Sequence, residues 1–247
     1  MFPGLGTVVN VATVIAGSSI GLLLGHRLPA RTRETVTDAL GLVTLLIGAL
    51  SAVKVTAPEL AASVGPNAPV LIVLGALLLG GITGSLVDIE ERLEGFGGWL
   101  RARLSRGDSH GRARFIEGFV TASLVFCVGP LTILGSLSDG LGLGADQLLL
   151  KATLDGFAAI AFAASLGSGV LASAIAVAVI QGLLTLVGFL IGDFLPPAHL
   201  AAITATGGLL LLGVGMRLLH LKAVPVGNLL PALLVAPLLV QLVTAFR

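Results

Sequence analysis

Long uncharged segments separated by short polar ones dominate the pattern of this chain. Residues 60–87, 194–216 and 223–246 contain no Asp, Glu, Lys or Arg, and residues 156–192 form one run too long for a single span, interrupted at Gly167-Ser168-Gly169. An α-helix needs about 20 apolar residues to cross the hydrocarbon core of a bilayer. The pattern therefore predicts eight membrane-spanning helices, near residues 5–26, 35–55, 67–87, 118–138, 147–166, 170–192, 199–220 and 226–245.

The composition supports the same fold class. Of the 247 residues, 55% are hydrophobic and 11% are charged, whereas a soluble domain carries about 25% charged residues. The net charge of +1 argues against a nucleic-acid partner, and the single cysteine excludes an internal disulfide. The N-terminus lacks the basic segment of a cleaved signal, so we expect the first helix to be retained. The prediction is an all-α integral membrane protein, one membrane domain over residues 1–247, with no cofactor.

Basic residues concentrate in two loops and predict the orientation. Most of the Lys and Arg residues fall in the 27–33 loop and in the long hydrophilic 88–117 segment, and loops rich in these residues are cytoplasmic. Arg217 and Lys222 also fall on the cytoplasmic side if 118–138 crosses the membrane. Seven spans plus a re-entrant segment at 118–138 would place both residues outside, which the charges disfavour.

Within the 88–117 segment, Phe96 and Trp99 stand among charged residues. Aromatic residues beside basic ones are typical of a helix that lies on anionic lipid. A solvated cytoplasmic loop with no partner is the alternative interpretation.

An internal similarity suggests a duplicated architecture. Residues 21–48 align without gaps to residues 188–215, with ten identical residues among twenty-eight positions. Charge counting places the turn of the first copy inside and that of the second outside, so the copies would be inverted repeats, as in many transporters. The repeats would cover 5–87 and 170–245, with a central broken-helix pair at 118–166 inserted between them. Convergence of two ordinary hairpins in a low-complexity sequence is the alternative.

The central pair contains a predicted helix break at Gly129-Pro130. Proline donates no N–H and crowds the carbonyl of Phe126, so a helix should kink or break there. Irregular backbone at membrane depth is tolerated where it is buried in protein or lines a water-filled cavity. The break, with the hydroxyls of Ser136 and Ser138 beside it, is therefore a candidate solute site, and a packing kink is the alternative. Asp139 and Asp146 are expected in an external loop, and a vestibule that attracts cations is one interpretation of these two carboxylates.

Lys151 and Asp155 are the charged residues of the fifth predicted span. They lie four residues apart and therefore share a helix face. Charged side chains within a span are costly and suggest function, so Asp155 is a candidate to bind a cation or carry a proton. A Lys151–Asp155 pair that neutralises itself at the membrane edge is the alternative. Asn10 and Gln181 are the other polar candidates inside spans, either lining the site or joining helices.

Small residues on the first span suggest a contact face. Gly17, Gly21 and Gly25 recur at fourfold spacing, which allows close helix packing. Ordinary packing within the chain is one interpretation, and a homodimer through this glycine face is another.

Several segments resemble one bacterial membrane family, domain of unknown function 554. They are GTVVNVATVIAGSSIGLLLGHRLP at the start, LVFCVGPLTILGSLSDGL, LLLKATLDGFAAIAFAASLGSGVL and GGLLLLGVGMRLLHLKAVPVGNLLPALLVAPL near the end. The resemblance implies a multi-pass protein of the bacterial cytoplasmic membrane. It implies no activity and no site residues.

Two functions are compatible with these features. The first is a transporter or channel for a small polar or ionic solute, either ion-coupled or facilitative, with the residues named above along its path. The second is a membrane scaffold or partner subunit that acts through the glycine face and the 88–117 loop. An enzyme is not expected, because the sequence has no nucleophile elbow, HExxH motif or phosphate loop.

Overall fold

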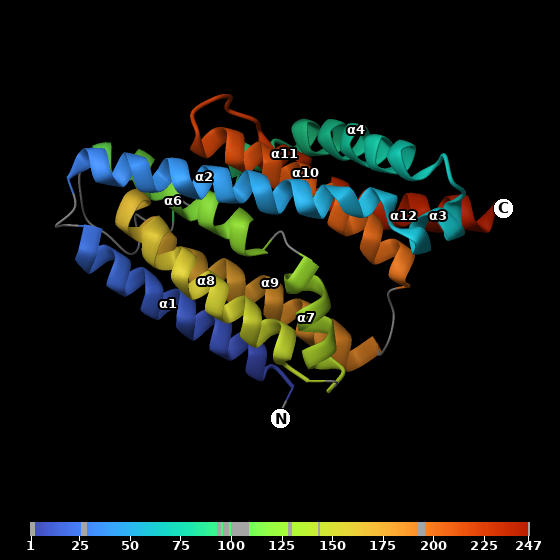
Figure 1. Ribbon diagram of the computed structural model, residues 1–247, viewed down its shortest axis with the longest axis horizontal. Coiled ribbons are helices and arrows are strands. Elements are labelled where there is room, and N and C mark those ends of the chain that lie inside the picture. Colours follow the sequence, from blue (N-terminus) through green and yellow to red (C-terminus); the bar gives the residue numbers. More distant parts are fainter. Residues whose placement is uncertain are drawn as a thin grey trace. The chain divides into compact units, whose positions relative to one another are not determined.

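The computed structural model of the chain describes residues 3–25, 29–92, 95, 99, 109–127, 130–142, 144–191 and 196–246. Every regular element among them is helical (Figure 1). The elements are α1 (Leu5–Gly25), α2 (Ala30–Ala52), the 3-10 helix η1 (Val53–Thr56), α3 (Pro58–Val64), α4 (Pro69–Val87), α6 (Ser109–Cys127), α7 (Pro130–Gly140), α8 (Asp146–Leu166), α9 (Gly169–Ile191), α10 (Pro197–Leu218), α11 (Val226–Leu229) and α12 (Ala232–Ala245).

Seven helical segments of the described residues are long and apolar enough to cross a membrane. They are Leu5–Gly25, Glu34–Thr56, Pro69–Val87, Asp146–Leu166, Gly169–Leu190, Pro197–Leu218 and Val226–Ala245. Each coincides with a predicted span, because each is an uncharged or nearly uncharged stretch of spanning length. The predicted all-α, multi-pass membrane fold is thereby confirmed.

The remaining predicted span, 118–138, is a bent pair of helices. Ala113–Cys127 and Leu131–Gly140 meet at 74°, so the chain breaks where Gly129-Pro130 predicted it. The helix before the break starts at Ser109, so the prediction of a loop through residue 117 was wrong for its last nine residues. The helical backbone continues beyond the apolar stretch, and the charged residues of its first turns concealed this in the sequence. Phe96 lies outside the described residues, so the predicted interfacial helix stays a prediction.

The chain divides into two compact units. Unit 1 comprises Met1–Gly41 and Glu94–Phe194, and unit 2 comprises Leu42–Leu93 and Leu195–Arg247. Helices of both expected repeats occur in each unit: α1 and α9 belong to unit 1, and α4 and α12 belong to unit 2. The candidate residues on described positions all fall in unit 1.

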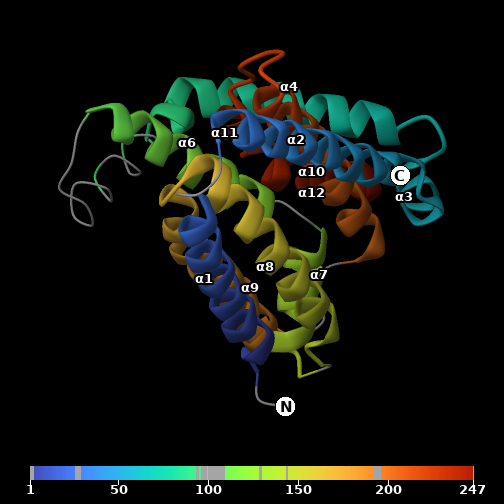
Figure 2. The same cartoon turned by 60° about the vertical axis from the view of Figure 1, so that its left-hand side comes forward.

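In unit 1, α1 lies along α8 (Figures 1 and 2). The two helices are parallel, because Gly6 near the start of α1 lies against Leu148, and Gly25 at its end lies against Ala164. On another side α1 packs antiparallel to α9, with Thr7 contacting Thr185. We call the two ends of unit 1 the Leu5 end, where α1 and α8 begin, and the Gly25 end, where they finish and α9 begins.

The bent pair α6–α7 runs between these two ends. Near its start, α6 packs against the first residue of α9, with the backbone of Phe115 close to Gly169. Near its finish, α7 packs against the last turns of α9, with Leu137 close to Gly188. The pair thus begins at the Gly25 end and reaches the Leu5 end, where α8 begins. These contacts favour a broken span over a re-entrant loop, and with it the count of eight crossings.

Unit 2 is built around a small apolar core to which α3, α4, α10 and α12 contribute, among them Leu60, Ile72, Ala202 and Ala236. Beyond α4, Glu90 joins three segments. Its carboxylate accepts hydrogen bonds from Arg217 Nη1 and from the backbone N–H of Gly227, both at 2.5 Å, and its own N–H donates to Asn228 Oδ1 at 2.8 Å. This set of bonds fixes the end of α10 and the start of α11 to the segment after α4.

Candidate functional site

A buried ion pair lies halfway along α8. Lys151 and Asp155 are 5% and 8% exposed, and Lys151 Nζ donates to Asp155 Oδ2 across one helical turn. The same oxygen accepts a hydrogen bond of 3.0 Å from Asn10 Nδ2 on α1. Asp155 lies nine residues into α8, or about 14 Å along the helix axis, which is close to the middle of a roughly 30 Å hydrocarbon layer.

The two charges neutralise each other, as one interpretation of the sequence proposed. They do so inside unit 1 rather than on an exposed edge. A buried ion pair needs further hydrogen bonds to offset the loss of hydration, and the amide of Asn10 supplies one. The interhelical role considered for Asn10 is thus observed.

Asn10 and Gln181 belong to neighbouring turns of the α1–α9 contact. Thr7 and Thr185 fix the register of the two antiparallel helices, with their hydroxyl oxygens 3.1 Å apart. Asn10 lies one turn after Thr7 on α1, and Gln181 lies one turn before Thr185 on α9. Because the two helices are antiparallel, both residues lie one helical turn further from the Leu5 end. Both side chains are fully buried. Among the described residues, neither amide atom of Gln181 has a hydrogen-bond partner, and neither does Asn10 Oδ1.

Asp139 occupies a different place from the expected one. The sequence predicted an external loop, but Asp139 lies in the last turn of α7 and is 3% exposed. Its Oδ2 accepts a 3.0 Å hydrogen bond from the backbone N–H of Gly6. The prediction was wrong because α7 extends to Gly140, and because the first N–H groups of α1 stabilise a carboxylate at that helix N-terminus. Asp146, expected in the same loop, begins α8 and is exposed.

The break between α6 and α7 is only partly described. Gly129 lies outside the described residues, and Pro130 is the first residue of α7, where its missing N–H costs no helical hydrogen bond. The carbonyl of Phe126, freed by the break, accepts a 3.1 Å hydrogen bond from Thr132 Oγ1. Ser136 is fully buried, and its hydroxyl has no partner among the described residues. Ser138 is half-buried.

Cys127, the last residue of α6 and next to the break, is buried. Polar groups succeed one another from the Leu5 end to the middle of unit 1. In order they are Asp139 with Gly6, Thr7 with Thr185, and Asp155 with its two donors, Asn10 and Lys151.

Thr7 and Thr185 did not figure among the candidates from the sequence. A signal was available, because Thr7 shares a helix face with Asn10 and Thr185 shares one with Gln181. Isolated threonines are common in membrane helices, so the sequence alone did not indicate that these two helix faces contact each other.

An aromatic contact lies beyond Asp155, toward the Gly25 end. Phe126 on α6 and Phe162 on α8 meet edge to face, with ring centroids 6.0 Å apart. Both rings are buried, at 0% and 1% exposure. This aromatic contact lies between the polar groups and the Gly25 end.

The glycine face of α1 is occupied within the chain. A Cβ atom at Gly17, Gly21 or Gly25 would overlap with backbone atoms of α8 at Gly156, Ile160 or Ala164. Close helix packing inside the chain therefore accounts for the glycine spacing, and this face is not available for a homodimer.

Fold and sequence together define a multi-pass, all-α membrane protein. The chain belongs to the family described as protein of unknown function (DUF554), which matches residues 5–241. It is 33% identical over 237 residues to the uncharacterized protein YqgA of Escherichia coli (strain K12), covering 94% of each chain. It is also 28% identical over 241 residues to the uncharacterized membrane protein YdfK of Bacillus subtilis (strain 168), covering 98% of this chain and 97% of that protein. No solved structure matches the chain.

Proposed function

We propose that the protein is a transporter or channel for a small polar or ionic solute. The observation that carries this proposal is the succession of buried polar side chains from Asp139 at the Leu5 end to Asp155 in the middle of unit 1. Three side chains near or along it, Asn10, Gln181 and Ser136, keep polar atoms without a partner among the described residues.

Unpartnered polar atoms are the informative part of this arrangement. A buried amide or hydroxyl that lacks a hydrogen bond costs about 1–3 kcal/mol, and no lipid group can supply the bond. A purely structural helix contact would gain stability if Gln181 were apolar. A buried amide with neither atom paired among the residues that the structure describes is therefore better explained by a ligand or water that supplies its partners.

The helix pairing supports the inverted-repeat architecture that accompanies this function. The order of helices in the expected repeats, 5–87 and 170–245, relates α1 to α9, α2 to α10 and α4 to α12. Each related pair is in contact: α1 with α9, α4 with α12, and α2 with α10 where Gly48 meets Gly208. Transporters with inverted repeats bind solutes near the bilayer midplane at the repeat interface, which is the depth of Asp155.

The proposed location is the bacterial cytoplasmic membrane, with the 27–33 and 88–117 loops in the cytoplasm. In this orientation the Leu5 end faces outward, so the polar groups lead from the outside to the middle of the membrane. The Phe126–Phe162 contact then separates them from the cytoplasm. Energy for uphill transport would come from an ion gradient or a partner protein, and the proposed activity includes no covalent step.

The experiment that tests the proposal uses Gln181→Leu. Purified protein in an uncharged detergent is heated with a panel of ions, amino acids, polyamines and organic acids. A ligand that binds only the folded state increases the free energy of unfolding, by about 2.7 kcal/mol at a ligand concentration of 100 times Kd, and so raises the melting temperature. We expect one class of solute to raise the melting temperature of the wild type but not that of Gln181→Leu. Without solute, this variant should be at least as stable as the wild type.

The same measurement is made on Asp155→Asn and on the double variant Lys151→Gln/Asp155→Asn. The double variant removes both charges of the pair and therefore leaves no charge unpaired. The single and double variants should both lose the solute effect if the carboxylate contributes to binding. If Gln181→Leu keeps the full solute response, the polar groups are not the binding site. A flat panel with a stable wild type would contradict transport and support the membrane scaffold instead.

A further inference from the structure

The buried polar atoms of unit 1 that lack a partner among the described residues all belong to uncharged side chains. They occur on Asn10, Ser18, Ser123, Ser136 and Gln181, which are amides and hydroxyls. The buried charged side chains are paired instead. Lys151 pairs with Asp155, and Asp139 accepts a hydrogen bond from the N–H of Gly6. The groups left for a solute are therefore uncharged.

Three of these side chains lie between the Leu5 end and the depth of the ion pair. Ser136 lies one turn before Gly140, which packs against the backbone of Thr185 near the Leu5 end. Gln181 lies one turn further in along α9 than Thr185. Asn10 reaches the depth of the ion pair itself, because its amide donates to the carboxylate there.

The other two side chains lie further toward the Gly25 end. Ser18 is about two turns after Asn10 on α1 and is fully buried. Ser123 lies one turn before Phe126 on α6, a helix that begins at the Gly25 end. Unpartnered hydroxyls and amides therefore occur on both sides of the Phe126–Phe162 contact, along most of the length of unit 1.

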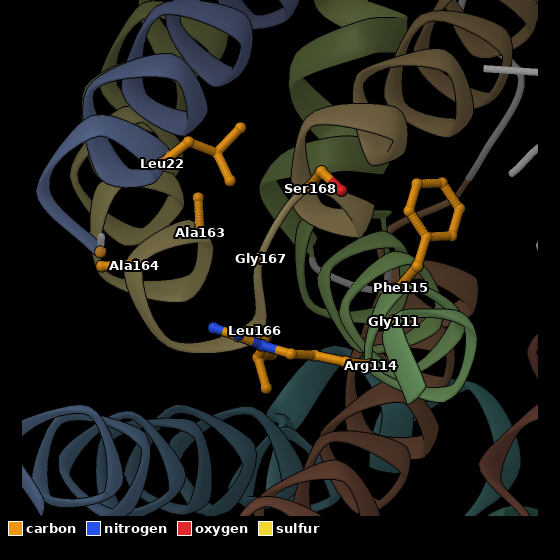
Figure 3. Close-up of a pocket in the computed structure, with 10 residues that line it drawn as sticks. Leu22, Gly111, Arg114, Phe115, Ala163, Ala164, Leu166, Gly167 and Ser168 are labelled. Carbon is orange, nitrogen blue, oxygen red and sulfur yellow. The ribbon is translucent and has the colours of Figure 1, made fainter. Parts of the chain in front are cut away.

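A cavity lies beyond the last of these hydroxyls. The described residues surround a space of about 380 Å³ at the Gly25 end, between the ends of α1, α6, α8 and α9 (Figure 3). Its lining includes Leu22, Phe115 and Ala163, and Ser123 lies about two turns along α6 from Phe115. The volume falls in the range of about 300–1,000 Å³ that is typical of small-molecule sites.

The free atoms include both donors and acceptors. Asn10 Nδ2 donates to the carboxylate of Asp155, so the free atom of this amide is its oxygen. Neither amide atom of Gln181 is paired, so this side chain offers donors and an acceptor whichever way the amide is turned. A bare cation would satisfy the oxygens and leave the N–H groups of Gln181 unpaired, and a bare anion would do the reverse. A solute that both donates and accepts satisfies all of them.

The charges of unit 1 also disfavour a bare ion. An ion leaves water at a high cost unless an opposite charge pairs with it. Lys151 already donates to Asp155, so a cation would have to displace it, and the pair has no net charge. Asp139 lies nearer the Leu5 end, beside the partial positive charge of the α1 N-terminus. An uncharged solute avoids the cost of an unpaired charge.

We propose that unit 1 conducts a small uncharged solute that both donates and accepts hydrogen bonds, and water, a polyol and an amide are the members of this class to be tested. This inference rests on the proposed transport function and narrows its solute. By charge counting, the solute would pass between the outside at the Leu5 end and the cytoplasm at the Gly25 end.

The test compares vesicles that contain the purified protein with protein-free vesicles of the same lipid. Stopped-flow light scattering measures water permeability after mixing with sucrose, and solute entry after mixing with glycerol or with urea. Uptake of radioactive sodium, rubidium and chloride is measured in the absence of these solutes. We expect the protein to raise the permeability to at least one of water, glycerol and urea, and to leave ion uptake at the protein-free level.

Three variants locate the effect. Gln181→Leu removes the free donors and acceptor, and should lower the protein-dependent permeability about tenfold or more. Ser136→Ala removes a free hydroxyl with little change in volume and should lower it as well. Gln181→Glu keeps the shape but replaces the N–H groups by an acceptor, and should also lower it, whereas a cation site predicts that this variant keeps or gains cation uptake. Gln147→Leu and Ser85→Ala, at exposed positions, are the matched controls and should behave like the wild type.

The outcomes separate this inference from the function on which it rests. Ion uptake that depends on Gln181, with no permeability to the uncharged solutes, would overturn the inference and leave transport intact. Vesicles that show no protein-dependent flux of any kind would contradict both. Uncharged permeability that is unchanged in Gln181→Leu and Ser136→Ala would overturn the inference as well. Should the Gln181 variants fail to fold, the comparison of Ser136→Ala with Ser85→Ala decides.

Discussion

The contact between α1 and α8 predicts the effect of one methyl group. In Gly17→Ala, the added Cβ would lie less than 3.0 Å from the carbonyl oxygen of Gly156, a distance that real Cβ atoms essentially never show. Ordinary van der Waals contact begins at 3.4 Å, and backbone cannot move aside as a flexible side chain can. The two helices must therefore separate by about 1 Å, with loss of the dispersion contacts along their interface.

The expected cost is about 1–3 kcal/mol, which is typical of overpacking in a close contact. Gly182→Ala is the matched control, because Gly182 also lies inside a helix and its Cβ would meet nothing within 4 Å. Alanine is favoured over glycine in helices by up to about 1 kcal/mol, so this variant should be neutral or slightly more stable. For a chain of this length each kcal/mol shifts the melting temperature by roughly 2–4 °C.

The chain offers a convenient assay. Its single cysteine, Cys127, is buried, so a dye that fluoresces on reaction with a thiol reports unfolding as the detergent-solubilised protein is heated. We expect Gly17→Ala to melt several degrees below the wild type and Gly182→Ala to melt at or above it. Equal melting temperatures for the two variants would show that α1 and α8 are not in close contact at Gly17.

Three further changes test other parts of the structure. Asp139→Asn removes the charge at the start of α1 and should lower stability by about 0.3–2 kcal/mol, whereas Asp146→Asn, at an exposed position, should leave the melting temperature within 1–2 °C (roughly 0.5 kcal/mol) of the wild type. Glu90→Gln weakens the bonds to the end of α10 and the start of α11 and should lower the free energy of unfolding by about 1–3 kcal/mol. Glu91→Gln, at an exposed neighbouring position, is its control in the same thermal assay. Phe162→Ala should cost about 3–5 kcal/mol, and in proteoliposomes it should raise passive solute leakage if the aromatic contact is the barrier, a result that an unchanged leak would contradict.

The sequence was sufficient to predict features that depend on local pattern. Apolar length located the spans, because a helix must match the bilayer whatever its neighbours are. The spacing of Lys151 and Asp155 predicted their pairing, because residues four apart on a helix are neighbours. The helix break before Pro130 followed from the covalent structure of proline.

Features that depend on contacts between distant segments could not be predicted in this way. Nothing in the sequence assigns Asn10 to Asp155, which lies 145 residues further along the chain. Asp139 was expected in a loop because its neighbours include several glycines, yet its carboxylate is buried against Gly6. The glycine face of α1 was recognised, but its partner α8 was not, since small residues allow many packing partners.

The parallel contact of α1 with α8 also bears on how the protein is made. α1 leaves the ribosome before its partner α8, which is not synthesised until more than a hundred residues later. During that interval the row of glycines on α1 lacks the backbone of α8 against which it packs in the folded protein. Final assembly of unit 1 therefore waits for the later helices, and Asn10 meets its ion pair only when α8 has been inserted.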